Sequence, residues 1–279
     1  MNATLSCRAG IATDPGLLRE KNEDRVYADE SAGIFLVVDG MGGRAAGEMA
    51  AQTAVDVITR YLHDSEGDVA GAITAANNEI YRLAEEREEW RGMACVLTLA
   101  IAHEDRITVG HVGDSRLYLV WNGTLRKITA DHSLVGELED RGTVTEAEAM
   151  AHPKRNEVFR DVGSRLRDAQ DAEFIEIKTL PFRPGAALLL CTDGLSDMLT
   201  AAEINEIVQR YPGDPGAVAR DLVDAANFAG GKDNVSVIFV AGPEFLGDAR
   251  VRNSITQVRE VKSWWRRLLN RVGRFLERH

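Results

Sequence analysis

Four apolar runs in this sequence each end in, or begin from, an aspartate. The runs cover 35–38, 109–112, 188–191 and 235–240, and the aspartates are Asp39, Asp114, Asp193 and Asp233. Short apolar runs bounded by glycine, aspartate or asparagine are typical of buried β-strands. If these strands are neighbours, the four carboxylates gather at one edge of the sheet structure.

The wider pattern of the sequence predicts an α+β fold. Runs of strand character occur at 8–13, 33–38, 93–102, 106–112, 116–120, 174–179, 186–191 and 235–240. Helices are predicted at 44–62, 69–89, 133–141, 201–210 and 215–226. Because few of these elements alternate strictly between strand and helix, a layered α+β domain is favoured over a doubly wound parallel sheet.

Carboxylates gathered at one edge would repel one another, and burial would remove their hydration. A cation should therefore lie among them, and oxygen ligands favour Mg²⁺ or Mn²⁺ over zinc. Gly40 follows Asp39 directly and would leave its backbone carbonyl free to approach a metal ion. Any single Asp-Gly pair is more simply a turn, but four aspartates placed alike favour metal binding.

A charged segment precedes another predicted strand: residues 19–24 read Arg-Glu-Lys-Asn-Glu-Asp. On local grounds this is a solvated charged turn. The functional alternative makes Arg19 a bidentate phosphate ligand and uses Glu23 and Asp24 to support a metal site.

Charge and cysteine content exclude several classes of protein. The net charge is −11, but residues 250–279 hold nine Lys or Arg and two Asp or Glu, so they carry +7 and the remainder carries −18. A body this acidic is a poor nucleic-acid binder. Three separated cysteines support neither a disulfide framework nor a zinc site. With no secretory signal and no apolar run long enough to span a bilayer, a cytoplasmic location is expected.

Seven motifs occur along the chain in a characteristic order. They are Arg-x-x-Asn-Glu-Asp from Arg19, Val-Asp-Gly-Met-Gly-Gly from Val38, Gly-Asp-Ser-Arg from Gly113, Asp-His-Ser-Leu-Val from Asp131, His-Pro-x-Arg-Asn from His152, Thr-Asp-Gly-Leu-x-Asp from Thr192 and Lys-Asp-Asn-x-Ser from Lys232. Through them, residues 8–241 resemble the metal-dependent protein phosphatases (type 2C serine/threonine phosphatases), specifically the compact bacterial members. The resemblance implies a four-layer α-β-β-α sandwich with two central antiparallel sheets.

The resemblance also implies two metal sites and a phosphate site. Asp39 would bridge two Mn²⁺ or Mg²⁺ ions, with the Gly40 carbonyl on one ion and with Asp193 and Asp233 completing the other site. Arg19 matches the arginine that binds the substrate phosphate. The implied reaction hydrolyses phosphoserine and phosphothreonine by in-line attack of a metal-bridging hydroxide, without a phosphoenzyme.

Four further carboxylates match supporting positions in the family. Glu23 and Asp24 would hold metal-bound waters, and Asp114 and Asp197, together with Asp193, would bind a third, weaker ion.

Residues 139–162 match a mobile flap of the family. A histidine proposed as general acid in some eukaryotic members is replaced here by Met41, which leaves His132 either as a candidate acid or as a structural residue.

Two functions are compatible with these motifs. The first is a protein serine/threonine phosphatase that opposes a bacterial Ser/Thr kinase. The alternative is a catalytically silent metal-binding scaffold that captures phosphoproteins. Because Asp39, Asp193 and Asp233 are all present, the enzyme is favoured.

A catalytic domain is predicted over 1–242 and a basic tail over 243–279. From Val258 to Leu276, apolar residues recur at helical spacing while arginines occupy a different face, which predicts a basic amphipathic helix. The helix could lie on an anionic membrane surface with Trp264 and Trp265 at the headgroup level. It could instead dock on a protein partner or a second copy, or fold back on the acidic body.

Overall fold

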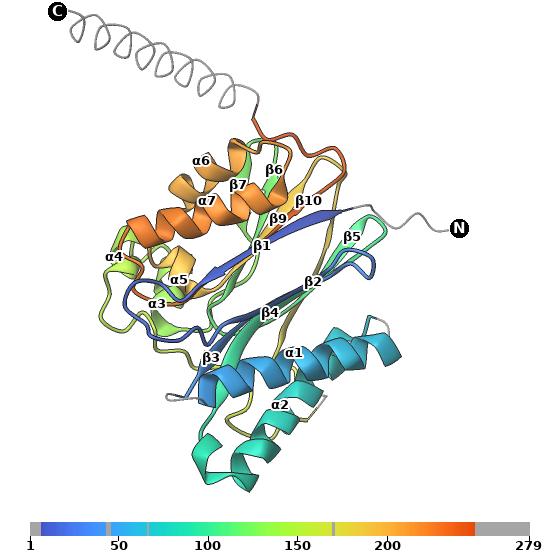
Figure 1. The fold of residues 1–279 in the computed structure, drawn as a ribbon, viewed down its shortest axis with the longest axis vertical. Helices are drawn as coiled ribbons and strands as arrows, with labels where there is room; N and C mark the ends of the chain where they lie inside the picture. Colours follow the sequence, from blue (N-terminus) through green and yellow to red (C-terminus); the bar gives the residue numbers. More distant parts are fainter. Residues whose placement is uncertain (1–6, 43–45, 66, 169–170, 249–279) are drawn as a thin grey trace, which may run out of the picture.

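Two antiparallel five-stranded sheets form the centre of the molecule (Figure 1). The structure is a computed structural model that describes residues 7–42, 46–65, 67–168 and 171–248. One sheet has the strand order β1 (Arg8–Asp14), β10 (Val235–Ala241), β9 (Ala187–Cys191), β6 (Arg116–Trp121), β7 (Thr124–Lys127). The other has the order β2 (Arg25–Asp29), β3 (Ile34–Met41), β4 (Ala94–His103), β5 (Arg106–Val112), β8 (Glu176–Pro181).

A pair of helices covers the outer face of each sheet (Figure 1). The sheet that contains β3 packs against α1 (Ala46–Asp64) and α2 (Val69–Glu86), and the other packs against α6 (Ala201–Gln209) and α7 (Pro215–Phe228). Shorter elements are η1 (Glu88–Trp90), α3 (Leu134–Asp140), α4 (Glu146–Met150) and α5 (Asp193–Ser196). The four-layer α-β-β-α sandwich implied by the resemblance is therefore confirmed.

Strand β3 explains why the sequence shows apolar runs instead of alternation. Leu36 and Val38 belong to the core layer beneath α1 and α2, whereas Phe35 and Val37 face the layer between the two sheets. Successive side chains of a strand point to opposite faces, and here both faces are covered. Every position from Ile34 to Val38 is consequently apolar and buried.

Strand register brings the ends of β3 and β5 to one edge. Asp39 pairs with Val96 near the start of β4, and the next residue of β4, Leu97, pairs with Val112 at the end of β5. Strands β3 and β5 therefore end on either side of the same point of β4, which places Asp39 and Asp114 at a common edge.

The other sheet delivers its two aspartates in the same way. Cys191, the last residue of β9, pairs with Val237 near the start of β10. Asp193 follows β9 and Asp233 precedes β10, so these two carboxylates share an edge as well. The four apolar runs predicted that the aspartates gather at one edge. The antiparallel register within each sheet produces this arrangement.

The predicted elements largely match the observed ones, with small differences. The helix predicted at 69–89 ends at Glu86 and is followed by η1, because Arg87 adopts an extended conformation. Strand β7 was not predicted, since its sequence Thr-Leu-Arg-Lys is short and mostly polar. None of the helices within the described part of the chain combines the length and hydropathy needed to cross a bilayer.

The chain continues to pack beyond the end of β10. Phe245 is buried against Tyr211 and Phe239, and the backbone N–H of Asp248 donates to the carbonyl of Gln209 at 3.1 Å. The predicted amphipathic helix lies outside the described residues.

Candidate metal and phosphate site

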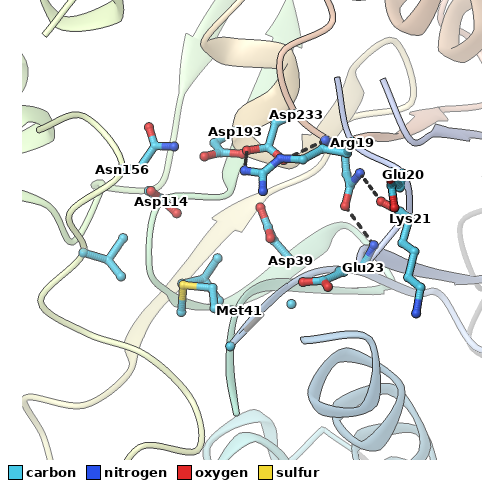
Figure 2. Close-up of a pocket in the computed structure, with 15 residues that line it drawn as sticks. Arg19, Glu20, Lys21, Glu23, Asp39, Met41, Asp114, Asn156, Asp193 and Asp233 are labelled. Carbon is cyan, nitrogen blue, oxygen red and sulfur yellow. Dashed lines mark hydrogen bonds and ion pairs between the residues drawn. The ribbon is translucent and has the colours of Figure 1, made fainter. Parts of the chain in front are cut away.

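A cavity of about 680 Å³ opens where the aspartate-bearing strand ends meet (Figure 2). Seven residues singled out from the sequence line it: Arg19, Glu23, Asp39, Gly40, Asp114, Asp193 and Asp233. They come from the β1–β2 loop, from the ends of β3, β5 and β9, and from the residues before β10. The fold therefore gathers carboxylates that are up to 210 positions apart in the sequence around one cavity, with Arg19 at its rim.

Asp39 and Asp193 are the two aspartates of the cavity whose pKa values are raised furthest. Burial, followed by the charges of neighbouring aspartates, raises the pKa of each carboxyl well above its ordinary value of 3.8. Asp193 also has a buried oxygen, Oδ1, that has no hydrogen-bond partner. Buried carboxylate oxygens without donors favour a bound proton or a cation.

Asp24 lies behind this pair and does not line the cavity. Its Oδ2 accepts a hydrogen bond from the Thr192 hydroxyl at 2.9 Å, while its buried Oδ1 has no partner. Burial raises its pKa to about 7, against the hydrogen bonds from Ser236 and Thr192, which lower it. Asp24 thus adds a further negative charge beneath Asp39.

Gly40 is required by close packing. A Cβ on Gly40 would lie 2.1 Å from the carbonyl oxygen of Gly47 in the first turn of α1 and 2.8 Å from that of Glu23. Any side chain would push β3 away from α1 and from the β1–β2 loop. The glycine therefore sets the spacing between three segments that line or border the cavity, a reason that the sequence pattern did not reveal.

Arg19 reaches across the mouth of the cavity. Its Nη2 donates to Asp233 Oδ2 at 2.7 Å, and this hydrogen bond raises the pKa of the guanidinium (Figure 2). The guanidinium stays charged and more than half exposed. It forms the ion pair with Asp233 at this edge of the cavity, which Lys21 also lines, and it can meet an anion that arrives from solvent.

Asn234 holds the loop that carries Arg19. Its Oδ1 accepts from the backbone N–H of Glu23 at 2.8 Å, and its Nδ2 donates to the carbonyls of Lys21 (2.8 Å) and Pro15 (3.0 Å). Sequence reasoning did not assign this role to Asn234. The only sign of this role in the sequence is that Asn234 directly follows Asp233. The hydrogen bonds themselves join segments that are more than 200 residues apart.

Asp197 is separated from the main cavity. It lines a smaller neighbouring space of about 30 Å³ together with Asp114 and Asp193. Its Oδ2 accepts from Arg155 Nε at 2.6 Å, so a residue of the 139–162 segment forms an ion pair with it, although burial still raises the pKa of the Asp197 carboxyl. In Asp114, burial followed by the charges of Asp131 and Asp197 raises the pKa to about 7.

The 139–162 segment contributes to the cavity wall through Asn156 and Val158 (Figure 2 labels Asn156). It is joined to the body by a bridge between Ser133 and Val158 and by another between Cys95 and Val162. The segment thus covers one side of the cavity and is attached near its end.

His132 does not line the cavity. Its Nδ1 accepts from the backbone N–H of Gly113 at 3.1 Å, and burial lowers its pKa to about 3. The ring is therefore neutral and internally bonded, which disfavours the candidate role of general acid and supports the structural alternative.

A second group of ligand-type side chains is formed by His111, His132 and Glu176, whose potential donor atoms lie within 4.8 Å of one another. His111 Nε2 faces the Ala130 carbonyl at 3.1 Å, and Glu176 Oε2 accepts from the Ala130 N–H at 3.0 Å. Because these atoms are satisfied by backbone groups, this cluster does not fit a metal ion. The aspartate cavity does, since it is lined by several carboxylates, of which Asp193 has a buried oxygen without a donor, and since Asp24 has another directly behind it.

Comparison with known proteins identifies the family. The sequence profile described as protein phosphatase 2C matches residues 19–220. The chain belongs to the protein phosphatase 2C family. The serine/threonine phosphatase stp of Listeria innocua is 34% identical over 252 residues, covering 83% of this chain and 94% of that protein. The serine/threonine protein phosphatase PstP of Mycobacterium tuberculosis is 36% identical over 241 residues, 84% of this chain and 45% of that protein.

Solved structures of the family share the fold described above. The M. tuberculosis phosphatase PstP/Ppp superposes with a TM-score of 0.75 at 34% identity, covering 84% of this chain and 98% of that one. The catalytic domain of PstP in complex with two manganese ions gives a TM-score of 0.74 at 34% identity, with 85% and 99% covered. The family resemblance drawn from the motifs is confirmed.

The raised carboxyl pKa values predict how stability depends on pH. Asp24 and Asp114 have pKa values of about 7 in the metal-free fold, against 3.8 for an ordinary aspartate. Between these values the folded state holds protons that the unfolded state has released, so the free energy of unfolding falls as pH rises, by about 1 kcal/mol per pH unit and per carboxyl. The Tm of chelator-treated protein should therefore fall between about pH 4 and pH 7.

The control experiments measure the Tm over the same pH range for the Asp114→Asn variant, and for the wild type with millimolar Mn²⁺. The variant removes one titrating carboxyl and should show a shallower fall, and Mn²⁺ should remove most of the dependence because a cation replaces the protons. A metal-free Tm that rises over this range, or one unaffected by Mn²⁺, would contradict the electrostatic description of the site.

Proposed function

We propose that this chain is a Mn²⁺- or Mg²⁺-dependent protein serine/threonine phosphatase that hydrolyses phosphoserine and phosphothreonine in proteins. The observation that supports it best is the convergence of buried, donor-poor carboxylates on a cavity that has Arg19 at its rim. Carboxylates hold hard cations, and a guanidinium recognises phosphate. Membership of the protein phosphatase 2C family points to the same chemistry.

The residues fit a pair of divalent cations. We assign Asp39 and the Gly40 carbonyl to one ion, and Asp39 with Asp193 and Asp233 to the other, consistent with the two manganese ions of the PstP catalytic domain. When bound, such cations lower the pKa of a coordinated water and offset charge on phosphoryl oxygens. The protein supplies fixed positions for them, because every one of these residues is attached to a strand end.

Arg19 binds the substrate phosphate in this proposal. Its present partner, Asp233, is one of the proposed metal ligands. Once Asp233 is committed to a cation, the guanidinium is available for a phosphoryl oxygen, and a fork of N–H donors matches that group in both charge and shape. Asn234 keeps the arginine in reach by holding the loop.

Cysteine chemistry is not available for this reaction. Cys95 and Cys191 are completely buried, and burial raises the pKa of the Cys191 thiol to about 12. Cys7 is buried as well, with a thiol pKa of about 11. A nucleophilic cysteine must be accessible and ionised, so attack by water fits this chain better than a phosphocysteine intermediate.

Supporting roles are assigned to the remaining carboxylates. Glu23 lines the cavity beside Gly40, and Asp24 stands behind Asp39, so both can orient water around the cations. We assign Asp114 and Asp197, with Asp193, to a third and weaker ion. Arg155 already pairs with Asp197, so a third ion must compete with that guanidinium, which is consistent with weak binding.

The test of this function compares Asp39→Asn with the wild type on a phosphothreonine peptide, with Mn²⁺ and with a chelator. We expect Asp39→Asn to lower kcat by about 100-fold or more, because the shared ligand is lost. Asp224→Asn, on the exposed face of α7, is the control and should keep wild-type activity.

Two results would overturn the assignment. Hydrolysis that persists in the chelator would exclude the metal-dependent mechanism. Metal-dependent binding of the phosphopeptide by the wild type without release of phosphate would favour the alternative, a silent phosphoprotein scaffold.

We further propose that the phosphatase opposes a bacterial Ser/Thr kinase and that its basic tail binds an anionic membrane surface. Residues 249–279 of the tail lie outside the described residues, so the sequence alone supports this: net charge +7 over 250–279, apolar residues at helical spacing, and Trp264-Trp265. A protein partner, a second copy and the acidic body itself are the alternatives.

A truncation after Asp248 tests the tail while keeping Phe245 in the core. The full chain should co-sediment with phosphatidylserine-containing vesicles and not with phosphatidylcholine vesicles, and the truncated chain should bind neither, because each basic residue near such a surface contributes about 1 kcal/mol. Equal sedimentation of both chains would contradict membrane binding by the tail.

A further inference from the structure

Two consecutive leucines stand exposed directly before Arg19. Leu17 is 65% exposed and Leu18 is 70% exposed, both in the β1–β2 loop. Isolated exposed apolar side chains are ordinary on protein surfaces. Among the large apolar side chains exposed in the described part of the chain, however, these two are the only pair adjacent in sequence. Their place beside the proposed phosphate ligand raises the question of what they contact.

The loop that carries the leucines is held in place by its backbone. The N–H of Leu17 donates to the Gly231 carbonyl at 2.7 Å, and the N–H of Gly16 donates to Asp14 Oδ1 at 2.9 Å. The same Asp14 oxygen accepts from Asn227 Nδ2 at 3.0 Å. The loop is therefore fixed to the end of α7 and to the segment that follows it, while both leucine side chains remain largely exposed.

A third exposed apolar side chain belongs to the adjoining end of α7. Leu17 Cγ and Asn227 Oδ1 both lie within 2.8 Å of the point where a Cβ on Gly231 would sit, so the two side chains are close neighbours. Phe228 follows Asn227 as the last residue of α7 and is 96% exposed. We call Leu17, Leu18 and Phe228 the apolar rim.

The residues of the apolar rim are close in sequence to the residues of the phosphate site. Leu18 precedes Arg19 directly, and Gly231, on which Leu17 rests, lies two residues before Asp233, the partner of Arg19. A polypeptide whose phosphorylated side chain reaches Arg19 therefore brings its flanking residues close to Leu18 and Leu17, which precede Arg19 in the same loop. The phosphate is common to all substrates, so selection among them has to come from contacts of this kind outside the cavity.

We propose that the apolar rim binds apolar side chains that flank the phosphorylated residue of the protein substrate. This inference rests on the proposed function of the cavity. Partial burial of one leucine side chain at the rim corresponds to about a fivefold gain in kcat/KM. The rim thus makes the enzyme favour phosphorylation sites with neighbouring aliphatic residues over sites with polar neighbours.

The test uses the full chain with Mn²⁺ and three phosphothreonine peptides. One has serine on both sides of the phosphothreonine, and the others carry two leucines either before or after it. The quantity compared is the ratio of kcat/KM for each leucine peptide to that for the serine peptide. We expect about fivefold for at least one leucine peptide with the wild type, and about one with the double variant Leu17→Ser/Leu18→Ser.

Controls separate the rim from the catalytic site. Leu246→Ser replaces an equally exposed leucine, 64% accessible, elsewhere on the surface and should keep the wild-type ratio. Melting temperatures should agree among all variants, since the replaced side chains are in solvent. Release of phosphate from p-nitrophenyl phosphate by the wild type tests the proposed function by itself, because this substrate has no flanking residues.

Four outcomes would overturn the proposal. The first is a wild-type ratio of one for both leucine peptides, and the second is a double variant that keeps the wild-type preference. The third is a double variant that loses kcat/KM equally on all three peptides. The fourth is a wild-type dimer that the double variant cannot form, which would assign the rim to a second copy. A wild type that hydrolyses neither p-nitrophenyl phosphate nor any peptide would instead refute the proposed function, and the rim proposal with it.

Discussion

Mutual repulsion among buried carboxylates is the constraint on which the rest of this structure depends. In Asp24, Asp39, Asp114 and Asp193, burial and then the charges of neighbouring aspartates raise the pKa of the carboxyl. Holding them together opposes folding unless protons or cations neutralise them. The proposed need for divalent metal and the expected pH dependence are consequences of this one arrangement.

The fold tolerates the repulsion because each aspartate is attached to a strand end in a packed sandwich. Phe35, Leu188 and Ile238 fill the layer between the sheets and are completely buried. Their burial supplies the favourable free energy that offsets the unfavourable cluster at the edge. Close backbone approach at Gly40 then determines how near β3 lies to α1 and to the β1–β2 loop.

Much of this arrangement could be predicted from the sequence, because it depends on local patterns. Apolar runs that end in aspartate predicted the shared edge, and ordered motifs around Arg19 and Asp39 predicted the family. The remaining features depend on contacts between distant segments. The clamp formed by Asn234 and the pairing of Asp197 with Arg155 join residues that no local pattern connects, and the neutrality of His132 follows from burial that only the tertiary structure reveals.

The central claim is that the aspartate cavity, and not the histidine cluster, is the metal centre. Anomalous diffraction from crystals of the full chain soaked in Mn²⁺ tests it most directly. Two strong peaks are expected in the cavity, both within ligand distance of Asp39, with Asp193 and Asp233 beside one of them. Peaks at His111, His132 and Glu176, or a cavity without any peak at saturating Mn²⁺, would contradict this account.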